Sequence, residues 1–326
     1  MRDQITMSLR DLKIVFMGTP EFALTSLQKL VEAGAQIVAV VTGLDKPAGR
    51  GLQIIETPVK KFAVQRGIPI LQPEKLNEPA FIAALQELHV DLFLVVAFRI
   101  LPREVFTIPP RGTINLHAAL LPRYRGAAPI QWAIMNGETE TGVTTFFIDE
   151  KMDNGEMLLQ ERVAIGENET AGELHDRLAL IGAELLLQTV TQLAEGRLQS
   201  RPQQGEITLA PKIKKETAEL DWSKPARVLR NWIRGLNPAP GAFTHWQGKL
   251  LKIFASDVRE DSAAEFLPGQ VCHVDATHGE LWIQTGEGTL ALRELQLEGK
   301  RRMSAAEFLR GHQVFLNDRL ESFRAP

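Results

Sequence analysis

Residues 13–18, KIVFMG, form the first regular segment of this 326-residue chain. Four consecutive apolar residues closed by a glycine predict a short β-strand that is buried on both faces. Residues 20–33 come next and have the apolar spacing of a helix that covers such a strand. Four side chains are predicted on its buried face: Phe22, Leu27, Leu30 and Val31.

The same alternation continues through the first half of the chain. Residues 37–41 (IVAVV) and 91–97 predict two more buried strands, and helices are predicted over 58–66 and 79–88. Continuous apolar strands that alternate with helices are typical of a parallel sheet covered on both sides. We therefore predict a doubly wound, Rossmann-like α/β domain with a mostly parallel sheet. Its site is expected at the carboxyl ends of the strands.

The pattern changes near residue 200. A long helix is predicted over 170–196, a polar linker over 198–212 and one further helix over 224–235. Short strands separated by glycine-containing turns then predict a small OB-like β-barrel. These strands are residues 250–254, 270–274, 280–285 and 289–295. The predicted division is an N-terminal domain over 12–197, a linker over 198–212 and a C-terminal domain over 213–326.

Composition limits the possible partners and the cellular compartment. The 37 Lys and Arg residues against 40 Asp and Glu give a formal charge of −3. A nucleic-acid partner would therefore have to be bound by a local basic patch. The single cysteine, Cys272, excludes a disulfide framework and a cysteine-based zinc cluster. We expect a cytoplasmic protein, because neither a signal peptide nor a membrane span is found. Translation could start at Met1 or at Met7.

The most informative stretch for chemistry is TINLHAALLP, residues 113–122. If residues 113–117 form a strand, Asn115 and His117 project from the same face, because side chains alternate along a strand. An amide beside an imidazole at the end of a strand suits the stabilisation of a developing oxyanion. On spacing alone, a core histidine tied to a neighbouring amide explains the same pattern.

A second candidate group follows 36 residues later, in residues 147–156 (FIDEKMDNGE). Asn154 and Gly155 predict a turn, because both tolerate a positive φ. Asp153 is then either a turn residue that accepts backbone hydrogen bonds or a carboxylate that orients an imidazole and supports its charged form.

Several other active-site types lack their motifs. The strand at 13–18 ends in one glycine without the G-x-G-x-x-G fingerprint, which argues against a nicotinamide oxidoreductase. The segment 43–51 is rich in glycine but contains no G-K-[ST], so it is not a P-loop. The seven histidines show no metal-ligand spacing such as H-E-x-x-H, and we expect no metal.

Taken together, three motifs resemble the folate-dependent formyltransferase family. They are Asn115-x-His117, the LLPRYRGAAP run at 120–129, and Asp153-x-Gly155. Three more stretches resemble most closely the members that formylate methionyl-tRNA: FMGTPEF at 16–22, KPAGRG at 46–51 and NPAPGA at 237–242. The match runs from about Leu12 to the C-terminus with every block in order.

This resemblance implies a reaction and the residues that carry it. Asn115, His117 and Asp153 are the implied catalytic residues. Ala119, Leu120, Leu121 and Pro122 are implied to border the site of 10-formyltetrahydrofolate, the co-substrate. The implied product is N-formylmethionyl-tRNA, which starts translation. No metal is needed, because the formyl donor is already activated.

The predicted tRNA contacts lie outside this core. Arg50, between two glycines, is implied to read the acceptor end of methionyl initiator tRNA, and Lys212, Lys214 and Lys215 could contact phosphates. The run at 300–302 (KRR) could do the same. Each lysine or arginine run is equally explained as a solvated surface.

Two positions depart from the family pattern. Ala119 stands where many members have serine, so a hydroxyl there cannot be essential for folate binding. Phe98 and Arg99 stand where many have Tyr-Gly, which leaves the pocket lining open.

Two other functions remain as alternatives. They are a formyltransferase for another amine, such as an amino-sugar nucleotide, and a catalytically silent RNA-binding relative. We expect a monomer.

Overall fold

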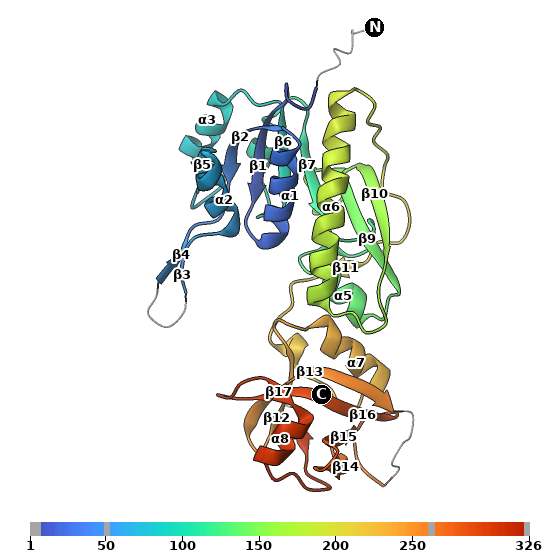
Figure 1. The fold of residues 1–326 in the computed structure, drawn as a ribbon. Helices are drawn as coiled ribbons and strands as arrows, with labels where there is room; N and C mark the ends of the chain where they lie inside the picture. Colours follow the sequence, from blue (N-terminus) through green and yellow to red (C-terminus); the bar gives the residue numbers. More distant parts are fainter. Residues whose placement is uncertain (1–7, 49–52, 260–264, 323–326) are drawn as a thin grey trace. The chain divides into compact units, whose positions relative to one another are not determined.

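The computed structural model describes residues 8–48, 53–259 and 265–322, and these form two compact units (Figure 1). The first unit contains the chain up to Pro129 together with Glu140–Ala164 and His175–Ala210. The second contains Ile130–Thr139, Ile165–Leu174 and the chain from Pro211 onwards. Two short segments that precede residue 175 therefore belong to the C-terminal unit. The predicted division at 197 and 213 remains our proposal for the domain boundaries.

The first unit is built on a seven-stranded sheet in the order β10-β9-β7-β6-β1-β2-β5. Its parallel strands are β1 (Lys13–Gly18), β2 (Gln36–Val41), β5 (Ile70–Leu71), β6 (Leu92–Val96) and β7 (Thr113–His117). Two antiparallel strands, β9 (Glu140–Phe147) and β10 (Met157–Ala164), extend one edge. The predicted doubly wound, mostly parallel α/β fold is confirmed.

Helices cover both faces of this sheet. The helices of the unit are α1 (Glu21–Glu32), α2 (Pro58–Arg66), α3 (Pro79–Glu87) and α4 (Arg103–Phe106), and most of α6 (Ala171–Ala194). Helices α1 and α6 lie side by side on one face, where Lys29 and Glu184 form an ion pair at 2.6 Å (Figure 1). Helices α3 and α4 pack on the other face against Val15 and Met17 of β1.

The sequence of β1 explains this arrangement. All residues from Ile14 to Met17 are fully buried. Neighbouring side chains of a strand point to opposite faces, so both faces of β1 must be covered. Gly18 ends the strand at a point where its backbone lies very close to atoms of neighbouring elements. A Cβ there would lie 2.5 Å from the Cβ of Ala23 and 2.9 Å from the carbonyl oxygen of Val96. The strand therefore turns directly into α1 only because residue 18 has no side chain.

Strands β9 and β10 were not predicted. Their sequences, ETGVTTFF and MLLQERVA, combine threonines and charged residues that weaken the apolar pattern. The buried threonines instead pair inside the unit, as Thr145 does with Thr189 of α6 at 2.9 Å. Beyond these strands, β11 (Leu209–Ala210) pairs in parallel with β8 (Arg125–Gly126). Most of the predicted linker thus packs against the first unit.

The C-terminal unit contains a second seven-stranded sheet, antiparallel throughout. Its strands are β12 (Ala242–Trp246), β13 (Lys249–Arg259), β14 (Val271–Asp275), β15 (Glu280–Gln284), β16 (Thr289–Leu297), β17 (Met303–Ser304) and β18 (Leu320–Glu321). Its helices include η1 (Glu216–Ala218), α7 (Ala226–Gly235) and α8 (Ala305–Gly311), and α5 (Pro129–Met135) lies almost wholly in this unit.

The two edges of this sheet meet. The amide of Val271 donates to the carbonyl of Asp318 at 2.8 Å, and the amide of Leu320 donates to that of Gly269 at 2.8 Å. The sheet therefore curls on itself around its own apolar core, which confirms the predicted small barrel-like domain. Strand β12 was missed, since AFTHW is short and begins beside a proline-rich turn.

Candidate active site

Strand β7 presents the two residues that the sequence singled out. Asn115 and His117 lie two positions apart on this strand, so their side chains share one face of the sheet. Asn115 is half-buried, and its side-chain amide makes no hydrogen bond to any residue in 8–48, 53–259 or 265–322. An amide with free donors next to an imidazole is ready to bind an oxygen of a substrate.

His117 is buried and held at one ring nitrogen. Its Nε2 lies 2.9 Å from the carbonyl oxygen of Tyr124, and its Nδ1 lies 3.9 Å from Oδ2 of Asp153. Because a carbonyl oxygen can only accept, Nε2 must carry a proton, and Nδ1 is the nitrogen that gains or loses one. The distance of 3.9 Å is too long for a direct hydrogen bond. The structure thus brings His117 and Asp153 together, and Nδ1 has no hydrogen bond to any of the residues described, so it can bind a substrate.

The turn that carries Asp153 is set by local constraints. Asp153 itself adopts the left-handed conformation, with φ of 50°, and its Oδ2 accepts a hydrogen bond of 2.8 Å from the amide of Gly126. A Cβ on Gly155 would lie 1.7 Å from the carbonyl oxygen of Phe147, so only glycine fits there. The sequence correctly indicates a turn, but the positive φ falls on Asp153 rather than on Asn154 or Gly155.

The predicted folate loop lies directly after β7. Ala119 is fully buried, and its carbonyl accepts from Oγ1 of Thr144 at 2.7 Å. The same Oγ1 accepts from the amide of Leu121 at 3.3 Å and from Nε2 of Gln160 at 2.9 Å. Since these bonds fix the loop through its backbone groups, a serine hydroxyl at position 119 is not needed to shape it.

The loop borders a hollow of about 520 Å³. Leu120, Leu121 and Pro122 line it together with Arg123, residues of β10, and the segment 201–206 apart from Gln203. Glu140, the first residue of β9, also lines it. Because β9 runs antiparallel to β7, Glu140 lies beyond the carboxyl end of β7, on the side where sheets of this type bind ligands.

The position where Phe98 and Arg99 replace the common Tyr-Gly has a structural role in this chain. Arg99 donates hydrogen bonds of 2.9 Å to the carbonyls of Pro73 and Glu74, which follow β5. Its guanidinium also lies 5.2 Å from the centre of the Phe98 ring. Arg99 therefore fastens two loops at the carboxyl edge of the sheet.

The predicted tRNA contacts lie in two separate segments of the chain. Arg50 lies outside the described residues, between β3 (Lys46–Ala48) and β4 (Gln53–Ile55), which pair as a hairpin. At the base of this hairpin, Lys60 forms an ion pair with Asp45, and together with Gln72 it holds the pKa of the Asp45 carboxyl below its ordinary value.

The lysines and arginines of the C-terminal unit differ in their surroundings. Lys212, Lys214 and Lys215 are exposed and make no ion pair within the described part of the chain. In contrast, the two arginines of the 300–302 run are engaged inside their own unit. Arg301 pairs with Glu307, and Arg302 pairs with Glu294 and lies 4.2 Å from the Phe254 ring centre. The three lysines are thus the better candidates for phosphate contacts.

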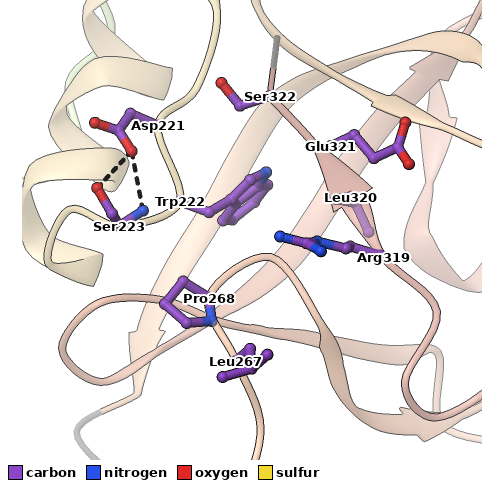
Figure 2. A pocket seen from close by; sticks show the side chains of 9 residues that line it. All are labelled: Asp221, Trp222, Ser223, Leu267, Pro268, Arg319, Leu320, Glu321 and Ser322. Carbon is purple, nitrogen blue, oxygen red and sulfur yellow. Dashed lines mark hydrogen bonds between the residues drawn. The ribbon is translucent and has the colours of Figure 1, made fainter. Parts of the chain in front are cut away.

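The C-terminal unit also has a hollow of its own, of about 610 Å³ (Figure 2). Trp222 is almost completely buried at this hollow, and its Nε1 donates to Oγ1 of Thr244 at 3.0 Å. Asp221 accepts two hydrogen bonds from Ser223, and Arg319 lies across from them (Figure 2). None of the predicted site residues lines this hollow.

Among residues 8–48, 53–259 and 265–322, no three His, Cys, Asp or Glu side chains form a group that could hold a metal ion. In the same part of the chain, no helix is long and apolar enough to cross a membrane.

Comparison with known proteins identifies the family. Residues 12–190 match the formyl transferase family model, and residues 212–313 match the model of the formyl transferase C-terminal domain. The methionyl-tRNA formyltransferase of Pelotomaculum thermopropionicum is 50% identical over 301 residues, which are 92% of this chain and 96% of that protein. This chain belongs to the methionyl-tRNA formyltransferase family. The family member from Symbiobacterium thermophilum is 48% identical and is covered over 97% of both chains.

Solved structures show that the fold extends beyond this family. The N-formyltransferase from Helicobacter canadensis, crystallised with folinic acid and dTDP-3-aminofucose, superposes with a TM-score of 0.65. The superposed region includes 90% of this chain and 100% of the Helicobacter canadensis chain, and the two are 18% identical. At this level of identity the similarity shows the fold alone. This superposition therefore carries no argument about the acceptor of this chain.

Proposed function

We propose that this protein transfers the formyl group of 10-formyltetrahydrofolate to the α-amino group of methionyl initiator tRNA. The chemistry rests on one observation, the buried His117 with Asp153 close to it, on the same strand as the free amide of Asn115. The acceptor is supported by the near-complete match to methionyl-tRNA formyltransferases, at about half of all positions. Because its acceptor is a charged tRNA, the protein acts in the cytoplasm as a translation enzyme.

The attacking amine needs little activation. An α-amino group titrates near pH 7.7–8.0, so a useful neutral fraction exists at about neutral pH without a strong base. When it attacks the formyl carbon, a new N–C bond forms and the formyl oxygen becomes negative. The free amide of Asn115 donates to this oxygen, and a protonated Nδ1 of His117 adds a charged donor.

Asp153 completes the proton transfer. The bond between the formyl carbon and N10 of the folate breaks, and one proton must move from the attacking amine to N10. The side chain of Asp153 is 13% exposed and its Oδ2 lies 3.9 Å from Nδ1 of His117, so one polar atom of a substrate can approach both groups from the side. A carboxylate there accepts the proton of the amine and stabilises the charged imidazole.

The three remaining site predictions are part of this proposal. Ala119, Leu120, Leu121 and Pro122 form the wall of the folate site, Arg50 contacts the acceptor end of the tRNA, and Lys212, Lys214 and Lys215 contact its phosphates. The lysines fit this role because they are exposed and make no ion pair among the described residues. We propose a monomer, which light scattering of the purified protein tests.

The test offers the purified protein formyl-labelled 10-formyltetrahydrofolate with either methionyl initiator tRNA or an amino-sugar nucleotide. We expect label on the methionyl-tRNA and none on the sugar. Label on the sugar nucleotide alone would overturn the choice of acceptor. Absence of transfer to either, with tRNA binding retained, would favour an RNA-binding relative without activity.

A further inference from the structure

Gln203 lies in the segment predicted as a linker, yet both ends of its side-chain amide are fully used. Its Nε2 donates to the carbonyl oxygens of Asp153 and Gly155 at 2.8 and 2.9 Å. Its Oε1 accepts from Nη2 and Nε of Arg125 at 2.6 and 3.2 Å. One side chain therefore connects the turn that carries Asp153 to strand β8.

Arg125 extends the same connection from the other side. Its Nη1 donates to Oδ1 of Asn154 at 2.9 Å, and Nδ2 of Asn154 donates to Oδ2 of Asp149 at the same distance. The residue after Arg125 is Gly126, whose amide holds the carboxylate of Asp153. The carboxylate and the backbone of Asp153 are thus both fixed by groups attached to β8.

Asp153 needs this support for a conformational reason. A non-glycine residue in the left-handed conformation is unfavourable by itself and persists only where its surroundings hold it. The two hydrogen bonds from Gln203 fall on the carbonyls of Asp153 and of the second residue after it. Removal of the amide would release the turn at the residue whose carboxylate faces His117.

We propose that Gln203 is a positioning residue for the formyl transfer, which acts with Arg125 by holding the Asp153 turn opposite His117. This inference rests on the proposed function, since it assigns Gln203 to the support of a catalytic carboxylate. A displacement of about 1 Å in a reacting group can lower a rate by about 100-fold. Gln203 is not among the residues that line the hollow beside the folate loop, so its loss should lower the rate of transfer rather than the binding of either substrate.

The amide is the group that the geometry requires. A glutamate at this position keeps an acceptor for Arg125 but has no donor for the two carbonyls. An alanine loses both interactions. We expect Gln203→Glu and Gln203→Ala to lower kcat by about 10- to 100-fold, with KM for folate and for tRNA within about 2-fold of the parent.

Gln65→Ala serves as the matched control. Gln65 is exposed on α2 of the same unit and makes no side-chain hydrogen bond within the described residues, so its kcat should equal that of the parent protein. Urea unfolding shows whether each variant is folded under assay conditions. A folded Gln203→Ala protein with the kcat of the control would overturn the proposal.

A double-substitution cycle with Asp153 separates positioning from a merely structural role. If Gln203 acts through Asp153, Gln203→Ala should change kcat by less than about 2-fold in an Asp153→Asn background. Equal loss in both backgrounds would overturn the proposal, because Gln203 would then act independently of Asp153. Near-normal turnover of Asp153→Asn alone would instead contradict the catalytic role of Asp153. The failures of the two proposals are therefore distinguishable.

Discussion

Thr144 of β9 holds the loop that follows the catalytic strand, and its replacement by valine is a sharp perturbation. The Thr144 hydroxyl is fully buried, donates to the carbonyl of Ala119 at 2.7 Å and accepts from the amide of Leu121 at 3.3 Å. Valine has the same shape without the hydroxyl. Thr144→Val therefore leaves the packing intact and removes the hydrogen bonds that fix the residues 119–122.

The cost follows from the groups left without a partner. The carbonyl of Ala119 and the amide of Leu121 both belong to buried residues, and each buried polar group without a partner costs about 1–3 kcal/mol. The 3.3 Å contact lies at the weak end of this range. Nε2 of Gln160 loses Thr144 but keeps the carbonyl of Leu121 at 3.1 Å, so its loss is small. We expect a total loss of about 2–4 kcal/mol in the free energy of unfolding.

Urea unfolding measures this loss, and titration with a folate analogue measures its effect on the loop. Thr141→Val is the control, because Thr141 is buried on the same strand and its hydroxyl has no hydrogen-bond partner among the residues that the structure describes. The control should be as stable as the parent or more so. Thr144→Val should also bind the folate analogue more weakly. Equal stability of the two valine variants would refute the reasoning.

Two further predictions concern the tRNA contact and the C-terminal unit. Arg50→Leu should strongly reduce transfer to methionyl-tRNA and leave folate binding unchanged, because leucine has no guanidinium to pair with phosphate or stack on a base. Steady-state kinetics with each substrate varied in turn checks this, and equal loss for both substrates would place the loop in the folate site instead. The amide of Ser304 and the guanidinium of Arg301 lower the pKa of Glu307 from 4.5 to about 2, so its contribution to stability is complete above pH 4.5 and is lost as the pH falls towards 2. Glu307→Gln should make urea unfolding of the C-terminal unit less dependent on pH in this interval, and an unchanged dependence would contradict the assignment.

Much of the fold could be predicted because the parallel strands are buried on both faces. The continuous apolar runs at 13–18, 37–41 and 91–97 have no other simple explanation, and each became a strand within one or two residues of the predicted bounds. The helix at 58–66 was predicted with its bounds, since Thr57 caps it and Gly67 ends it in the left-handed conformation.

The missing parts depend on contacts between distant residues. Strand β9 contains threonines that look like surface residues and are buried by pairing, as Thr145 is with Thr189. Gln203 lies 50 residues from Asp153 in the sequence, and a glutamine in a segment rich in proline and glycine gives no local sign of such a contact. The sequence could predict that Asn115 and His117 share one face of a strand, because side chains alternate along it. The approach of Asp153 came only from the resemblance.

The central claim is that the site on β7 carries out the transfer, and a single-turnover measurement tests it most directly. Protein saturated with formyl-labelled 10-formyltetrahydrofolate is mixed with methionyl initiator tRNA, and the rate of label transfer is followed for the parent protein and for His117→Ala and Asn115→Ala. The account predicts rates lower by about 100-fold or more, with binding of folate and tRNA retained. Folded variants that transfer the formyl group within about 3-fold of the parent rate would contradict it, since a loss of one oxyanion donor costs about 100-fold.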